Sequence, residues 1–230
     1  YISNNKKITF IMDIGNSAEK KFSKKYQAGC LSFEIVSGNN KLICNTGFYY
    51  NKNDRLTTLC KSTAAHSTLY IDNHSSCALN KLNVKKGLKI ISKKINIEKD
   101  FDQVAAGHNG YQKKYGYLHE RKIKFFKKKK LFLGRDSLIT SKKAVKANFG
   151  IRFHVHPETK MVKTQDATTV LLSIQNGEGW KFTCYNYELI IEKGIYWRNK
   201  NKASENENIF ISGIAEQKDL SINWKFEKIS

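Results

Sequence analysis

The chain has 230 residues, enough for one large sandwich or two small domains, and 40% of them are hydrophobic, which excludes a disordered polypeptide. No stretch approaches the apolar length that spans a bilayer, and no dinucleotide fingerprint, P-loop, GxSxG or HExxH motif is present. The formal net charge of +21 points to an acidic partner. A codon bias that favours lysine explains the same charge, and both explanations stay open at this stage.

Alternation of apolar and polar residues recurs along almost the whole chain, as in Ile8, Phe10 and Met12. Hairpin turns are expected at 38–40, at 127–130 and at the Asn-Gly-Glu-Gly turn 176–179. Strands are predicted at 8–14, 30–36, 41–45, 68–72, 88–97, 119–126, 131–138, 149–156, 168–175, 180–185, 189–192, 209–213 and 222–226.

No segment shows a sustained helical period with caps, and the polar segment 200–208 is expected to be a loop. Many short strands at regular spacing predict an all-β fold, a large antiparallel β-sandwich, with residues 1–230 in one domain.

Cysteine and histidine offer few metal ligands by spacing alone. The five cysteines form no CxxC pair, which argues against a zinc finger. His154 and His156 alternate on one predicted strand and share a side of it, but no third ligand is in view.

Six motifs follow one another in a fixed order. They are Gln-Ala-Gly-Cys-Leu-Ser-Phe-Glu at 27–34, Leu-Ile-Cys-Asn-Thr-Gly at 42–47, Thr-Ala-Ala-His-Ser-Thr at 63–68, His-Asn-Gly-Tyr at 108–111 with 117–121 after it, Arg-Phe-His-Val-His-Pro at 152–157, and Asn-Gly-Glu-Gly-Trp-Lys-Phe at 176–182. Together these motifs cover nearly the whole chain. Because they occur in this order, the chain resembles the heparinase II/III-like family.

The resemblance implies that this chain is the C-terminal β-sandwich of a polysaccharide lyase, which closes over a cleft formed by an α/α toroid. The toroid is expected upstream and is absent here. The implied reaction is β-elimination at a uronic acid of an acidic polysaccharide, with the isolated domain inactive. The family's setting implies the periplasm or cell envelope, although no export signal lies in this sequence.

The chain departs from the family at its zinc site. Better-known family members carry His-x-His-x-Asp at the first signature: the first histidine, which helps at the cleft, is Lys25 here, and the second, a zinc ligand, is Gln27. The other ligand positions fall on Asn45 and His66. Because glutamine and asparagine are poor zinc ligands, no metal and no other cofactor is expected.

The candidate catalytic residues are Lys25, which would neutralise the sugar carboxylate, and His66. Two interpretations of His66 are open: it faces the cleft and touches the sugar, or it hydrogen-bonds neighbouring backbone where a strand begins. The candidate substrate-binding residues are Lys61, His108, Tyr111 and Tyr49.

Two other functions remain possible. In the first alternative, the chain is a non-catalytic module that binds an anionic glycan. The loss of histidine at positions 25 and 27 favours this alternative. Alternatively it binds nucleic acid non-specifically, which only the charge supports, because no nucleic-acid-binding motif is visible.

Overall fold

The computed structural model describes residues 1–5, 7–51, 55–80, 83–141, 143–199 and 202–230. The first sheet has the strand order β1-β2-β3-β4-β12-β17-β16, with β5 paired to β12. Its strands are β1 (Ile2–Asn5), β2 (Ile8–Met12), β3 (Phe33–Ser37), β4 (Asn40–Cys44), β5 (Leu69–Ile71), β12 (Ala147–Val155), β16 (Ile190–Asn199) and β17 (Lys202–Ala215).

The second sheet has the order β13-β14-β15-β18-β11-β10-β9-β8, and all of its pairings are antiparallel. Its strands are β8 (Ile90–Ile97), β9 (Phe101–His108), β10 (Tyr117–Phe126), β11 (Leu131–Thr140), β13 (Lys160–Lys163), β14 (Thr169–Ser173), β15 (Gly179–Thr183) and β18 (Leu220–Lys228). A small separate hairpin joins β6 (Ala78–Asn80) to β7 (Asn83–Lys86).

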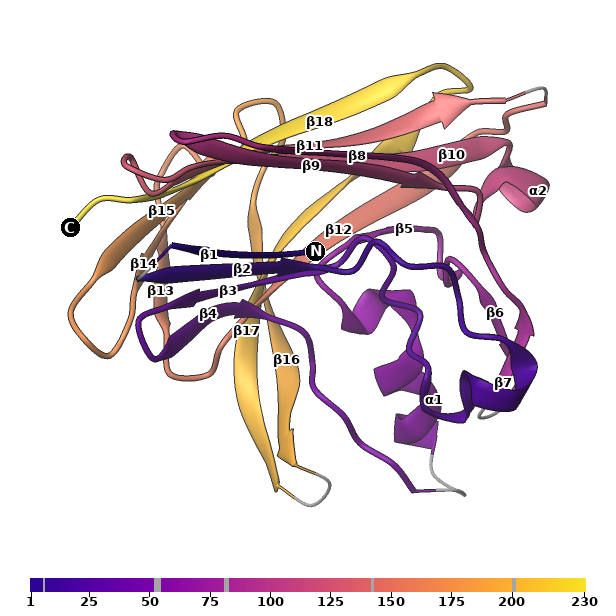
Figure 1. Ribbon diagram of the computed structural model, residues 1–230, viewed down its shortest axis with the longest axis horizontal. Helices are drawn as coiled ribbons and strands as arrows, with labels where there is room; N and C mark the ends of the chain where they lie inside the picture. The colour runs from indigo at the N-terminus through magenta and orange to yellow at the C-terminus, as the bar shows by residue number, and fades with distance from the viewer. Residues whose placement is uncertain (6, 52–54, 81–82, 142, 200–201) are drawn as a thin grey trace.

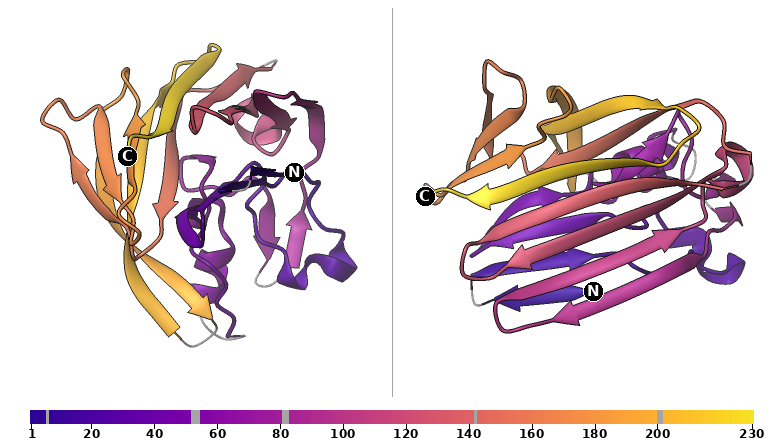
Figure 2. Two further views of the ribbon diagram at one scale, coloured as in Figure 1. Left: turned by 60° about the vertical axis from the view of Figure 1, so that its left-hand side comes forward. Right: turned by 90° about the horizontal axis from the view of Figure 1, so that it is seen from above.

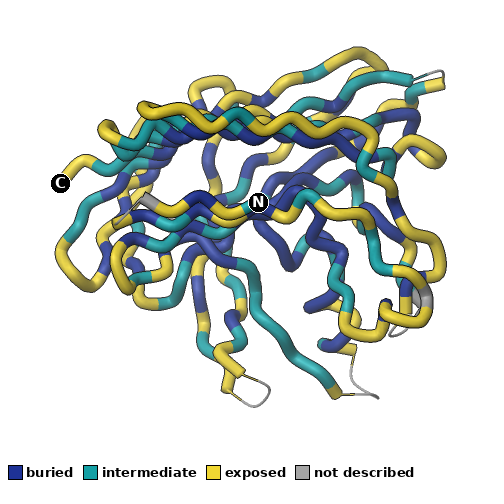
Figure 3. The backbone as a smooth tube through the Cα atoms, in the orientation of Figure 1, coloured by how far each residue is buried: buried dark blue, intermediate teal, exposed yellow. Residues whose placement is uncertain are grey.

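The two sheets lie face to face: in Figure 1, β8 to β11 and β18 of the second sheet lie above β1 to β4, and the right-hand view of Figure 2 looks down on that layer. Aromatic side chains join them: Phe33 of β3 stacks on Trp224 of β18 with ring centroids 5.4 Å apart, and Phe10 meets Phe132 at 5.6 Å. Burying each such ring stabilises the fold by about 1.5–3 kcal/mol. Figure 3 shows buried stretches along the sides where the sheets meet, so the predicted antiparallel sandwich is confirmed.

All three predicted hairpins are confirmed, including that of β14 and β15, which pair antiparallel around the 176–179 turn. Strands β3 and β4 pair antiparallel through Gly38, which has a φ of +57° that glycine adopts without strain. Strands β10 and β11 pair along ten residues around the 127–130 turn.

The expectation of a loop at 200–208 is wrong from residue 202 onward, while 200–201 lie outside the described residues. Strand β17 begins at Lys202, because the polar stretch alternates as part of a long hairpin with β16 (Figure 1). Asn206 is buried there and donates to the Val155 carbonyl at 2.9 Å. A strand can therefore be polar wherever its side chains find solvent or backbone partners.

Short helices also lie in the connections, where the sequence shows no sustained helical period. Two short α-helices, α1 (Arg55–Lys61) and α2 (Gln112–Tyr115), and two 3₁₀ helices, η1 (Lys20–Lys25) and η2 (Thr63–Ala65), lie in the connections. Each is too short to show a helical period in sequence. Within the described part of the chain, no helix is long and apolar enough to cross a membrane.

Candidate functional site

The first family signature forms an irregular connection between η1 and β3. Lys25 ends η1 with an exposed side chain, and the next residues run alongside the end of α1, where the Ala28 amide donates to the Lys61 carbonyl at 2.8 Å. Gly29 lies directly against the imidazole of His66: a Cβ there would come within 2.5 Å of the ring carbon Cδ2. Only glycine therefore lets this connection lie against the histidine.

His66 follows η2 and is only 3% exposed. Its Nδ1 lies 2.8 Å from the Ser62 carbonyl, and its Nε2 lies 3.2 Å from Oε1 of Gln27. Burial lowers the pKa of His66 to about 4, so the ring is neutral at pH 7. The expectation that His66 touches the sugar is corrected, because both ring nitrogens face protein oxygens and almost none of the ring is accessible.

A pocket of ≈ 510 Å³ opens where Gln27 meets the connection after β4. It is lined by Lys24, Lys25, Gln27, Phe48 and Tyr50. Phe48 and Tyr50 have parallel rings, 6° apart in orientation and 6.3 Å apart. Two cations beside a pair of aromatic rings suit an anionic sugar, since a ring can stack on the sugar face while an ammonium group meets its carboxylate.

Tyr49 does not line this pocket. Its ring lies 4.3 Å from the ring of Trp197 on β16 and is partly buried. Tyr50 is the tyrosine of this doublet that lines the pocket. Alternation could not reveal that, because 48–51 lie outside any strand and period 2 does not apply to them.

The substrate-binding role expected of Lys61 is corrected by its burial. Its side chain is 1% exposed, and Nζ donates to the Lys24 carbonyl at 2.7 Å. Burial lowers the pKa of Lys61. The residue thus anchors η1 and holds the backbone beside Lys25 in place.

The substrate contacts expected of His108 and Tyr111 are corrected for the same reason. Both are at most 1% exposed, and the Tyr111 hydroxyl donates to the Leu69 carbonyl at 3.0 Å. His108 Nε2 lies 3.3 Å from Nδ1 of His119, whose Nε2 lies 2.8 Å from Asp136.

Asp136 is the centre of this buried network. Arg121 binds both of its carboxylate oxygens, at 2.8 and 3.0 Å, and the Trp224 indole donates to it at 2.9 Å. Arg121 also donates to the Leu31 carbonyl at 2.9 Å, which ties the second sheet to the first signature. The second half of the fourth motif therefore maintains the sandwich.

The positions of the family's zinc ligands do lie together, but their residues do not fit zinc. Gln27 is engaged with His66. Asn45 uses both ends of its amide, because Nδ2 donates to Glu34 at 3.0 Å and Oδ1 accepts from the Ser67 amide at 2.8 Å. Within the described residues, no three His, Cys, Asp or Glu side chains gather around a possible metal. One imidazole and two amides that are engaged in hydrogen bonds form a poor donor set for zinc.

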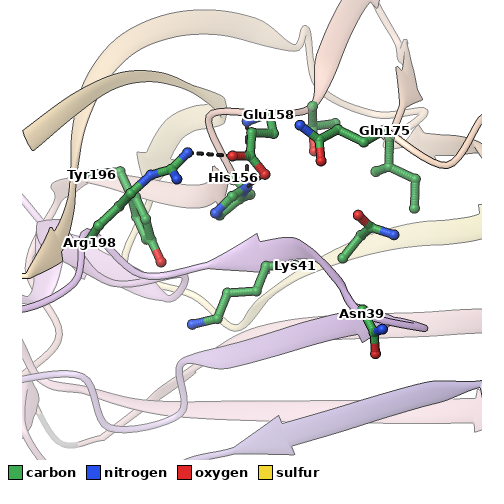
Figure 4. A pocket seen from close by; sticks show the side chains of 10 residues that line it. Asn39, Lys41, His156, Glu158, Gln175, Tyr196 and Arg198 are labelled. Atoms are coloured by element: carbon green, nitrogen blue, oxygen red, sulfur yellow. Dashed lines mark hydrogen bonds and ion pairs between the residues drawn. The ribbon is translucent and has the colours of Figure 1, made fainter.

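A second pocket, of ≈ 310 Å³, lies at the end of β12 and holds His156 (Figure 4). Arg198 pairs with Glu158 across it, and Lys41 lies 3.7 Å from Glu34. Its cations are thus already paired with carboxylates, so we expect this pocket to bind an anion more weakly than the Lys25 pocket does.

The comparisons with known proteins bear on the whole chain. The model of the family described as Heparinase II/III-like, C-terminal, matches residues 1–225. No curated protein sequence matches.

Solved structures of similar fold include heparan sulfate lyase HepC from Pedobacter heparinus, with TM-score 0.80, 17% identity and 97% of this chain covered. Heparinase III follows, with TM-score 0.74, 14% identity and 96% covered. A 4-alpha-glucanotransferase from Thermococcus litoralis gives TM-score 0.50, 10% identity and 99% covered.

The chain spans 33% of the length of the HepC and heparinase III chains and 37% of the glucanotransferase chain. These identities show the fold alone, whereas the family model carries the relationship. The chain belongs to the Heparinase II/III-like, C-terminal family and is a polysaccharide lyase-like β-sandwich domain.

Proposed function

We propose that this chain is the sandwich part of a lyase that cleaves an acidic, uronic-acid polysaccharide, and that its Lys25 pocket forms one wall of the substrate cleft. The observation that carries the proposal is the grouping of Lys24 and Lys25 with Phe48 and Tyr50 around Gln27, at the family's first signature. An α/α toroid in the same polypeptide supplies the other wall, and the protein works in the periplasm or cell envelope.

In the proposed reaction a base on the toroid removes the proton at C5 of the uronate. The electron pair forms the C4–C5 double bond, and the glycosidic oxygen leaves C4 and takes a proton from an acid. Lys25 supports the first step, because an ammonium group beside the carboxylate stabilises the negative charge that develops there. His66 acts through position alone, by holding Gln27 and the connection that carries Lys25.

The alternative is a module that binds the anionic glycan without cleaving it. Lysine in place of the family's cleft histidine favours this alternative, since lysine keeps the charge while losing a base that is half-neutral near pH 7.

The deciding experiment uses the natural polypeptide that contains these residues. Its size is measured by immunoblot of its own cells, and it is assayed on a uronic-acid polymer for the ultraviolet absorbance of the new double bond. We expect a polypeptide much larger than this chain that releases unsaturated ends, while the 230-residue chain alone releases none. Cleavage by the 230-residue chain would refute the proposal that the catalytic base lies on the toroid. Binding without cleavage by the natural polypeptide would support the glycan-binding alternative.

A further inference from the structure

The outer face of the second sheet carries a groove that the proposed cleft does not explain. The groove encloses ≈ 460 Å³ and is lined by residues of β9, β10, β11, β15 and β18 and by Tyr185 after β15. Four cationic side chains line it, those of Lys122, Lys124, Arg135 and Lys225. No carboxylate is among its described lining residues. In Figure 1, strands β8 to β11 and β18 of this sheet lie at the top, whereas α1 lies below the first sheet.

The register of the sheet places two of these cations opposite each other. Lys122 of β10 and Arg135 of β11 are directly paired residues in the antiparallel ladder. Like charges at such a position destabilise a sheet. Neither side chain has a carboxylate within ion-pair distance in the described part of the chain. The neighbouring cations have other partners: Lys124 Nζ lies 3.7 Å from the centroid of the Phe101 ring, and Lys225 Nζ lies 2.8 Å from a Glu227 carboxylate oxygen that Lys181 shares.

Arg135 stands out among the strand arginines. Arg121, Arg152 and Arg198 each pair with a carboxylate. Arg135 instead donates through Nε to the amide oxygen of Asn223 at 2.8 Å, which fixes the plane of its guanidinium group without neutralising it. In a chain with only five arginines, a fixed and uncompensated guanidinium is suited to binding a carboxylate or sulfate through two hydrogen bonds.

We propose that this groove is a second binding site for an anionic polysaccharide, with Lys122 and Arg135 as its anion-binding pair and Tyr185 as a stacking ring. Tyr185 is 73% exposed at the edge of the groove. The choice of a glycan among polyanions rests on the proposed function. One exposed aromatic ring also suits a sugar better than single-stranded nucleic acid, which uses a series of stacking rings. A polymer held at both faces gains avidity from the local concentration of the second site.

The test measures binding to the groove separately from binding to the Lys25 pocket. Variants are built in a Lys25→Ala/Tyr50→Ala background, and a heparan sulfate oligosaccharide is titrated by calorimetry. Lys122→Ala/Arg135→Ala is compared with the matched pair Lys160→Ala/Lys218→Ala, which removes two exposed cations elsewhere. We expect at least a tenfold loss of affinity for the first pair and less than a twofold loss for the second.

Folding controls and a competing polyanion complete the test. The thermal midpoint of Lys122→Ala/Arg135→Ala is expected to rise, because a repulsive pair is removed. Equal losses in both pairs would overturn the proposal, and so would tighter binding of single-stranded DNA that depends on Lys122 and Arg135. If Lys25→Ala/Tyr50→Ala alone leaves affinity unchanged while the groove variant lowers it, the proposed cleft fails and the groove stands.

Discussion

His66 and Gln27 lie against each other, with the histidine Nε2 3.2 Å from the glutamine Oε1. The contact joins the first and third family motifs at the place where the resemblance implies a zinc ion. The hydrogen bond links residues that are 39 positions apart in the chain.

Restoring the ligands is expected to restore metal binding. The wild-type chain should hold no stoichiometric zinc after dialysis, because amides are poor ligands. Gln27→His/Asn45→Asp, with His66 retained, should bind one zinc ion. Zinc at 100 times its Kd should then stabilise the variant by about 2.7 kcal/mol. Metal analysis and thermal unfolding with and without zinc measure both effects, and stoichiometric zinc in the wild type would contradict the account.

Gly29→Ala should destabilise the chain by about 1–3 kcal/mol, because the new Cβ would lie 2.5 Å from the buried His66 ring, which has no room to move. Gly15→Ala is the matched control, since its Cβ would meet nothing closer than Asp13 Oδ1 at 3.4 Å. Urea unfolding of both variants measures the difference. Equal midpoints would mean that the connection does not need glycine at residue 29.

Acid should destabilise the fold through its buried histidines. Burial lowers the pKa of His66 to about 4 and that of His154 to about 3, whereas unfolded histidine titrates near 6.5. The stabilising effect is complete above pH 6.5, where both states are neutral. It is lost as the pH falls toward 4, because only the unfolded state takes up protons.

For His66 the loss is on the order of 3 kcal/mol. Unfolding free energies between pH 7.5 and 4 check it, and His66→Gln should show a shallower slope. A wild-type stability that stays constant from pH 7 to 5 would rule this explanation out.

Arg121→Met should cost about 3–5 kcal/mol, because it leaves the buried Asp136 without its two-pronged partner. The guanidinium of Arg121 holds the pKa of Asp136 below its usual range. Without it, Asp136 should become protonated at low pH in the variant. Arg135→Met, on the outer face of the same sheet, is the control and should not destabilise the fold. Denaturant unfolding compares the two, and similar midpoints would show that the buried network is dispensable.

Most strands of the two sheets were predictable from the sequence, because alternation such as Ile8, Phe10 and Met12 reports directly which side of a strand is buried, but β1, β9 and β13 were not predicted. The residues of the candidate site were less predictable. Lys25 and the aromatic pair around it lie in connections without period, where nothing in the residue order states which side chain faces solvent. His108, Tyr111 and Lys61 are polar residues in family motifs, and their burial depends on partners far along the chain that only the fold brings together. The family motifs thus contain both residues that line the Lys25 pocket and buried residues that support it.

The proposed function requires that the Lys25 pocket bind an acidic sugar. The most direct test titrates a uronic-acid oligosaccharide into the wild-type chain, into Lys25→Met, and into Lys21→Met, which removes an exposed cation from the same helix η1 outside the pocket. We expect about a tenfold weaker Kd for Lys25→Met, because one charge-assisted hydrogen bond is lost, and less than a twofold change for Lys21→Met. Equal effects of the two substitutions would show that only overall charge attracts the glycan and would contradict the claim.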